Sequence, residues 1–215
     1  VVGGIGIGSR GSYDLGCFLR QPDVLFTAVC DVKASRRAAV KKRADQHYGT
    51  SNCDTYRDFR KLLDRKDIDA VLIATGPNWH ATASIYAARA GKDMYCEKPT
   101  TKNISQSLLL AETMRRTARV FECGTQRRNL PHFAFACALA RTGKLGKLKK
   151  VHAHPGGMGT KMSGWATPQP LPPIEQVDWD LYLGPAAWRP FNRGHLNGFH
   201  FEKGGGLVGG GVLEW

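Results

Sequence analysis

The sequence predicts an α/β fold built around a doubly wound parallel sheet. Three observations predict it. Short apolar runs alternate with helical segments down to about residue 122, as expected for parallel strands joined by crossover helices. A glycine-rich turn follows the first run directly, and an aspartate closes the second. The 215 residues, 42% of them hydrophobic, suffice for one large domain, or one domain and part of another.

Six strands are expected in the first part of the chain, at residues 1–6, 24–31, 53–56, 69–75, 93–97 and 119–123. Helices are expected between them, at residues 10–20, 34–47, 57–65, 80–91 and 103–118, with a further helix at 131–141. Six strands complete one doubly wound domain. We therefore expect residues 1–125 to form the first domain.

The pattern changes after about residue 145. Lys147–His154 alternates enough to predict a strand, and a segment rich in Pro and Gly follows. The run Trp179-Asp180-Leu181-Tyr182-Leu183-Gly184-Pro185 predicts a turn of helix packed by its aromatic side chains. We expect residues 126–215 to be the start of a second, α+β domain, which is incomplete where the chain stops at Trp215.

The turn Gly6-Ile7-Gly8-Ser9-Arg10-Gly11 has the spacing of a dinucleotide-binding loop, and Asp31 lies twenty residues beyond it. Gly6 permits the tight turn, Gly8 lets the backbone approach a diphosphate, and Gly11 lets helix and strand pack. Backbone N–H groups of the turn, Ser9 and Arg10 included, then meet the phosphates at the positive end of a helix. Asp31 accepts hydrogen bonds from the ribose. An ordinary glycine turn is the alternative, which the flanking strands and Asp31 disfavour.

The choice between NAD and NADP depends on the residues around Asp31. Arg36 and Arg37 follow it closely and offer guanidinium groups to the 2′-phosphate of NADP. The carboxylate of Asp31 would repel that phosphate, so we expect NAD, with NADP as the alternative.

Polar side chains follow the last three strands of the predicted sheet, where ligands of such folds bind. Thr75, Asn78, His80 and Glu97 are the candidates for further cofactor contacts, and Lys98, Arg127 and Arg128 for substrate contacts. Lys98 is the candidate catalytic residue, because a lysine at a buried strand end can exchange protons with a substrate hydroxyl; an ion pair with Glu97 is the alternative.

Plainer interpretations exist for three of these side chains. The alternative to a cofactor contact for His80 is that it caps or packs against the following helix. The alternative to substrate contacts for Arg127 and Arg128 is that both are ordinary surface charges. We expect one of them to face the cleft.

Composition excludes several classes of protein. The net charge is +13, but the basic residues are spread over several helices, as on solvated faces, so we expect no nucleic-acid partner. No apolar run approaches the ~20 residues that cross a bilayer, and we expect a cytoplasmic protein, although export of a folded protein is compatible with the sequence. None of the six cysteines forms a CxxC pair, so we expect neither a disulfide framework nor a metal site.

Taken together, these segments resemble the Gfo/Idh/MocA family of NAD(P)-dependent oxidoreductases. The resemblance rests on the glycine turn, Asp31, Pro77-Asn78-Trp79-His80, Glu97-Lys98-Pro99 and Gly124-Thr125-Gln126. It extends to Asp178-Trp179-Asp180-Leu181-Tyr182-Leu183-Gly184-Pro185. The Glu-Lys-Pro triplet is the most specific of these motifs. In the family it lies beside the nicotinamide, and its lysine contacts the substrate hydroxyl or shares in proton transfer.

The resemblance implies an oxidoreductase that transfers a hydride between NAD(P) and a sugar or polyol, and a homo-oligomer in the full-length form. Relatives on the same scaffold cleave glycosides with tightly held NAD but tend to lack the Glu-Lys-Pro triplet, so Lys98 favours the dehydrogenase. The family's second acid/base group, a histidine after a glycine-rich strand, would lie beyond Trp215. A nucleotide-binding fragment without catalytic activity is therefore the third alternative.

Overall fold

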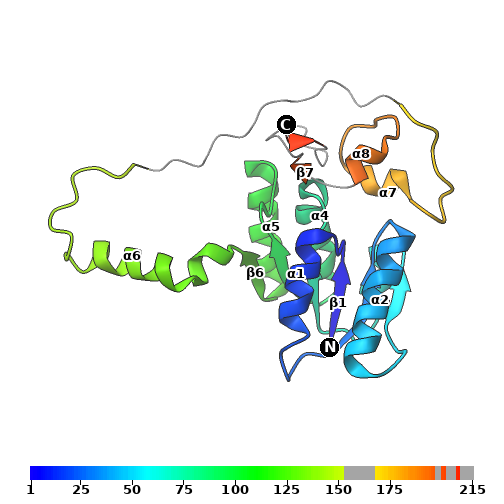
Figure 1. Cartoon of the computed structure of the whole chain (residues 1–215), viewed down its shortest axis with the longest axis horizontal. Helices are drawn as coiled ribbons and strands as arrows, with labels where there is room; N and C mark the ends of the chain where they lie inside the picture. Colours follow the sequence, from blue (N-terminus) through cyan, green and yellow to red (C-terminus); the bar gives the residue numbers. More distant parts are fainter. Residues whose placement is uncertain (153–167, 197–199, 202–206, 209–215) are drawn as a thin grey trace.

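The computed structural model describes residues 1–152, 168–196, 200–201 and 207–208. Its centre is a six-stranded sheet in the order β3-β2-β1-β4-β5-β6, in which every neighbouring pair is parallel (Figure 1). The strands are β1 (Val2–Ile5), β2 (Phe26–Cys30), β3 (Asp54–Tyr56), β4 (Ala70–Ile73), β5 (Asp93–Glu97) and β6 (Phe121–Gly124). The predicted doubly wound parallel sheet is confirmed.

Helices cover both faces of this sheet. On one face α1 (Ser9–Phe18) and α2 (Ala34–Tyr48) pack against β1 and β2 through one apolar cluster. On the other face α3 (Phe59–Leu63) and α4 (Pro77–Arg89) share a second cluster with the central strands, and α5 (Ile104–Thr117) lies beside α4. Burial on both faces explains why the central strands β1, β2 and β4 are continuous apolar runs rather than alternating ones.

Local sequence signals set the ends of these helices. Pro77 occupies the first turn of α4, where its missing N–H costs nothing. The Asn103 side chain accepts a hydrogen bond from the Gln106 N–H at 2.9 Å and so caps α5. Gly49 ends α2 in the left-handed conformation, with φ of 66°.

The chain leaves the sheet after β6. A short 3₁₀ helix, η1 (Gln126–Asn129), leads into α6 (Pro131–Arg141), which projects away from the sheet and has no buried residue (Figure 1). The strand expected at Lys147–His154 is wrong for residues 147–152, which form no strand, and the rest of it lies outside the described residues. Residues 147–152 are exposed on both sides, so their alternation of apolar and polar residues does not reflect a strand packed on a core.

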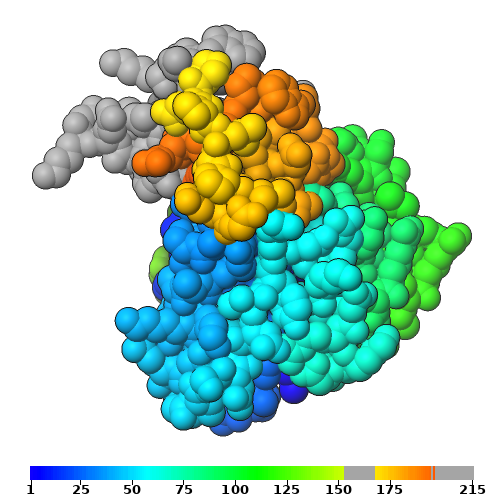
Figure 2. All heavy atoms as spheres, turned by 90° about the vertical axis from the view of Figure 1, so that its right-hand side faces the viewer, coloured from blue at the N-terminus to red at the C-terminus, as the bar shows by residue number. Residues whose placement is uncertain are grey.

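Residues 168–196 return to the carboxyl end of the sheet and contain α7 (Trp179–Leu183), as predicted, and α8 (Arg193–Leu196). They have a small apolar core of their own, made by Val177, Trp179, Leu183, Phe191 and Leu196. Figure 2 shows this segment, yellow to orange, packed on the first domain. A two-stranded antiparallel pair, β7 (His200–Phe201) and β8 (Leu207–Val208), follows. In the part of the chain described, no helix has the length and apolar character of a membrane span.

Tyr48 joins the end of α2 to the start of β2. Its hydroxyl donates a hydrogen bond to the Val24 carbonyl and accepts one from the Phe26 N–H, both at 3.1 Å. Tyr48→Phe leaves both backbone groups without this partner, so we expect the free energy of unfolding to fall by about 1–3 kcal/mol. Urea unfolding measures it, with Tyr86→Phe, an exposed tyrosine, as the control; equal stability of the two variants would contradict the assignment.

Candidate functional site

The junction of β1 and α1 requires glycine at two positions, one in the turn and one in the first turn of the helix. Gly6 has φ of 72°, and a Cβ there would lie 2.4 Å from Cγ2 of Thr75. A Cβ on Gly11 would lie 2.9 Å from the Cβ of Ala74, at the end of β4. Both approaches bring α1 tightly onto the carboxyl end of the sheet, because neither position has room for a side chain.

The N-terminus of α1 is open to an anion. Its N-cap residue is Gly8, no side chain caps the helix, and its first turn holds no acidic residue. The first N–H groups of a helix lack partners within the helix and carry the positive end of its dipole. The guanidinium of Arg36 adds charge to this place, since its Nη1 lies 3.1 Å from where a Cβ of Gly8 would be. A diphosphate fits this arrangement.

Asp31 lies directly after β2 and is only 5% exposed. Its Oδ1 accepts a hydrogen bond from the Lys33 N–H at 2.8 Å. Burial raises the pKa of its carboxyl, and the Lys33 N–H and the nearby Arg36 act in the opposite direction. A buried carboxylate held this way can accept hydrogen bonds from the hydroxyls of a ribose.

The glycine turn and Asp31 line one cavity of about 330 Å³ at the carboxyl ends of the central strands. The loop from β4 into α4 forms a second side. The third side comes from far along the chain, from Leu181, Tyr182 and Leu196. This is the place where open α/β sheets bind their ligands.

Seven of the residues predicted to bind a cofactor line this cavity: Gly6, Gly8, Ser9, Arg10, Asp31, Thr75 and Asn78. Gly11 packs beneath it, as its contact with Ala74 shows. The amide of Asn78 donates to the carbonyls of Tyr182, at 3.2 Å, and Leu183, at 2.8 Å. The Asn78 amide therefore points toward residues 168–196, the segment that returns to the sheet.

His80 lies under the loops rather than among the residues that line the cavity, and is 1% exposed. Its Nδ1 lies 2.6 Å from the Pro99 carbonyl oxygen and its Nε2 lies 3.0 Å from that of Thr75. Burial lowers the pKa of the ring, and the two carbonyls oppose this shift. The side chain thus ties the loop after β4 to the loop after β5.

Glu97 ends β5, is buried, and is the centre of a polar cluster. Its Oε1 accepts from Nε of Arg10 at 3.2 Å and from the amide of Gln126, and its Oε2 accepts from the Lys98 N–H at 3.2 Å. A Cβ on Gly124 would lie 2.7 Å from Oε1, so glycine leaves the carboxylate its space. The cluster fixes the backbone where Lys98 begins its loop.

The predicted substrate residues lie at the surface. Lys98 is exposed and precedes a cis peptide bond to Pro99. Arg127 and Arg128 are exposed on η1, and the Arg127 guanidinium lies 5.5 Å from the centre of the Phe133 ring. Neither arginine lines the cavity that holds Asp31.

Asp14 belongs to the Glu97 cluster and was missed in the sequence. Its Oδ1 pairs with Arg10 at 2.8 Å, and its buried Oδ2 has no hydrogen-bond partner within the described residues. Burial, followed by the charge of Glu97, raises the pKa of Asp14 to about 6. The i, i+4 spacing from Arg10 was the available signal, but only the fold brings Glu97 to the same place.

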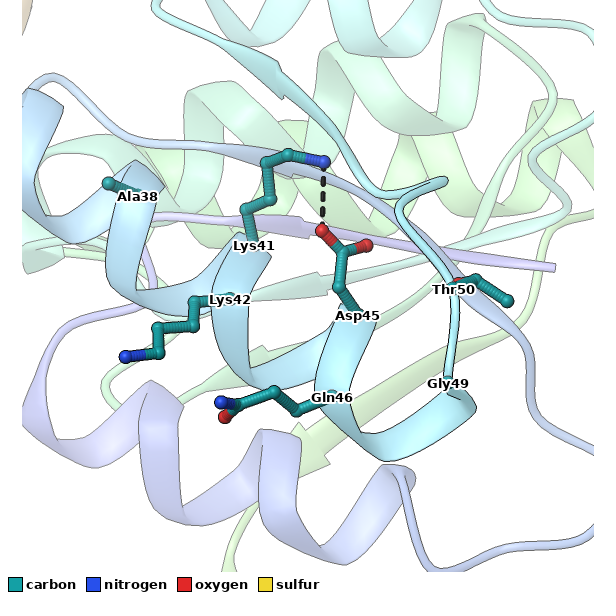
Figure 3. Close-up of a pocket in the computed structure, with 7 residues that line it drawn as sticks. All are labelled: Ala38, Lys41, Lys42, Asp45, Gln46, Gly49 and Thr50. Carbon is teal, nitrogen blue, oxygen red and sulfur yellow. Dashed lines mark ion pairs between the residues drawn. The ribbon is translucent and has the colours of Figure 1, made fainter.

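Another hollow lies on α2, between Ala38 and Thr50 (Figure 3). Its Lys41 pairs with Asp45 at 2.9 Å and donates to the carbonyls of Ser51 and Cys53. The lysine therefore anchors the loop after α2, and we assign this hollow no function.

The fold and the cavity define a dinucleotide-binding Rossmann domain. The sequence profile of the Gfo/Idh/MocA oxidoreductases, described as an oxidoreductase family with an NAD-binding Rossmann fold, matches residues 1–125. The chain therefore belongs to this NAD-binding family.

Two bacterial proteins illustrate the similarity in sequence. The uncharacterized oxidoreductase YrbE of Bacillus subtilis is 32% identical over 149 residues, which are 68% of this chain and 41% of YrbE. A glycosyl hydrolase family 109 protein of Saccharopolyspora erythraea is 38% identical over 124 residues, 55% of this chain and 26% of that protein. The chain thus spans less than half the length of either relative.

A solved structure supports the fold. Scyllo-inositol dehydrogenase of Lactobacillus casei, with bound NAD(H) and scyllo-inositol, superposes with a TM-score of 0.60 at 23% identity, over 68% of this chain and 42% of that one. At this identity the likeness shows the shared fold alone.

Asp14 makes a pH-dependent contribution to stability. The folded protein keeps its proton up to about pH 6, whereas the unfolded chain releases it near 3.8. Between these values the folded state binds more protons, so the free energy of unfolding falls as pH rises. Asp14→Asn keeps a donor in the proton's place. We expect urea unfolding to show the wild type losing stability relative to this variant from pH 4 to 6.5.

The control for this measurement is Asp23→Asn, which changes an exposed carboxyl. It should follow the wild type across the same pH range. Parallel curves for the wild type and Asp14→Asn would show that Asp14 does not hold its proton.

Proposed function

We propose that this chain carries the cofactor site and part of the substrate site of an NAD-dependent oxidoreductase that acts on a hydroxyl or carbonyl of a sugar or polyol. One observation carries the proposal: the open N-terminus of α1 and the buried Asp31 face one cavity. This pairs an anion site with a ribose site in the same cavity, as the binding of a dinucleotide requires. The polyol class is our proposal, taken from the substrate of the inositol dehydrogenase that shares this fold.

When bound, NAD supplies a nicotinamide ring that exchanges a hydride with the carbinol carbon of the substrate. The residues of the chain then have separate tasks. The α1 N-terminus holds the diphosphate, and Asp31 holds the ribose of the adenosine half. Lys98 orients the substrate hydroxyl and moves its proton, while Arg127 and Arg128 contact the rest of the substrate.

The pairing of Glu97 supports this role for Lys98. The Glu97 carboxylate is bonded to Arg10, Gln126 and the Lys98 N–H. The alternative, in which Glu97 and Lys98 neutralise each other, would need an ion pair between their side chains. The part of the chain described contains no such ion pair. An exposed ammonium on a backbone held by the Glu97 cluster is suited to meet a substrate.

The preference for NAD over NADP follows from the arginines near Asp31. Arg37 donates to the Asp31 backbone carbonyl at 2.6 Å, and Arg36 donates to the Leu196 carbonyl at 3.1 Å. Both guanidinium groups have partners in the protein, and the Asp31 carboxylate repels a 2′-phosphate. NAD is therefore the cofactor we propose.

A glycoside hydrolase that uses NAD is the second candidate, because a glycosyl hydrolase family 109 protein is 38% identical over 124 residues. Lys98 favours the dehydrogenase. The two differ in their products, since the hydrolase releases sugar without net formation of NADH. Assays of NADH formation with inositols and other polyols, beside assays of sugar release from glycosides, separate them.

Asp31→Ala should weaken NAD binding about tenfold or more, because the variant loses hydrogen bonds between a charged acceptor and the ribose. NADP binding should fall less, since the repulsion of its 2′-phosphate is also removed. Calorimetric titration measures both affinities, with Asp23→Ala as the control. An unchanged affinity for NAD would remove Asp31 from the ribose site.

Lys98→Met should lower turnover by about a hundredfold or more while the affinity for NAD changes little, because proton transfer is lost and the cofactor contacts remain. Steady-state kinetics and titration with NAD measure the two effects. Lys66→Met, at an exposed lysine before β4, is the control. A fully active Lys98→Met enzyme would reject the proposed role.

A further inference from the structure

We propose that residues 176–196, here called the strap, form the outer wall of the adenosine subsite, so that adenosine binds between the glycine turn and Tyr182. The inference rests on the proposed function and goes beyond it. The first domain alone supplies only the inner wall of this subsite. The strap is attached to the sheet and helices at two places, and it presents Tyr182 to the cavity.

The strap pairs with the backbone directly after Asp31. The Ala34 N–H donates to the Gln176 carbonyl at 2.9 Å, and the Asp178 N–H donates to the Val32 carbonyl at 3.1 Å. These bonds form an antiparallel bridge between Lys33 and Val177. The strap is thereby held in register beside the residue that binds ribose.

A second attachment joins α7 to the start of α4. The last carbonyls of a helix lack partners within the helix. Asn78 donates to two of them, and Nε1 of Trp79 donates to the Leu181 carbonyl at 2.6 Å. Residues on α4 therefore cap α7, which explains why Asn78 lines the cavity while its amide bonds to the strap.

Gly184 makes this attachment possible. It has φ of 53°, and a Cβ there would lie 2.2 Å from Cε2 of Trp79. The strap passes so close to the Trp79 ring that no side chain fits between them. Any residue other than glycine at this position must push the strap off α4.

Tyr182 is the aromatic residue that the strap presents. It lines the cavity together with Asp31 and Arg36. Its ring stacks on Trp179, with ring centres 5.0 Å apart and 10° between the planes, and Trp179 is 3% exposed. A ring held this firmly loses little entropy on contact with a flat base.

The position of the strap indicates that it contacts the adenosine half of the dinucleotide rather than the nicotinamide half. It contacts the loop after β2 and the first turn of α4, whereas Lys98 follows β5, two strands beyond β1 in the sheet. Asp31 marks the adenosine ribose in this class of fold. The chemistry of hydride transfer is placed at the Lys98 end, so the strap contributes affinity rather than catalysis.

The test measures binding of NAD and of ADP-ribose, which lacks the nicotinamide, to the whole chain by calorimetry. Tyr182→Ala should weaken both by about tenfold, the scale of one base–aromatic stacking contact, and Tyr182→Phe should bind like the wild type. Gly184→Ala should weaken both at least as much. Gly143→Ala is its matched control, because Gly143 has φ of 74° with no atom within 4 Å of a Cβ.

The outcomes separate the two proposals. If the wild type binds both ligands and Tyr182→Ala binds them equally well, the subsite is overturned while the proposed function remains. If the wild type binds neither ligand, the proposed function fails and the subsite fails with it. If Gly184→Ala does not fold, the comparison of Tyr182→Ala with Tyr182→Phe decides the subsite alone.

Discussion

The candidate site is organised around the open N-terminus of α1 at the carboxyl end of β1. This arrangement exists because Gly6 adopts a positive φ against Thr75 and because Gly11 lets α1 lie against Ala74. A side chain at either place would move the helix away from the sheet. The positive end of α1 would then no longer face the cavity that Asp31 enters from β2.

The edge of the sheet around this helix keeps polar groups that a purely structural core would avoid. Asp14 and Glu97 are both buried, and a single guanidinium, that of Arg10, pairs with each of them. Burial, followed by the charge of the nearby Glu97, raises the pKa of Asp14. Such costs concentrate at functional sites, and this one lies where the backbone turns toward Lys98.

The strap holds a late part of the chain against the first strands and helices of the fold. Its small apolar core is separate from the two clusters of the sheet, and its attachments to the sheet domain include side-chain hydrogen bonds, an antiparallel bridge and an ion pair between Arg57 and Asp178 at 3.4 Å. Polar attachments of this kind are individually modest in energy. They are directional, however, and they define where Tyr182 lies relative to Asp31.

The six strands, their helices and the dinucleotide-binding turn could be predicted from the sequence, because these features depend on local periodicity and on glycine at defined positions. The contacts between side chains of distant segments could not be predicted in this way. Arg10 and Asp14 are four residues apart, but Glu97 reaches them from β5, and Tyr182 reaches Asp31 from more than a hundred residues away. Contacts between distant segments depend on how helices and strands pack, and no local pattern records that packing.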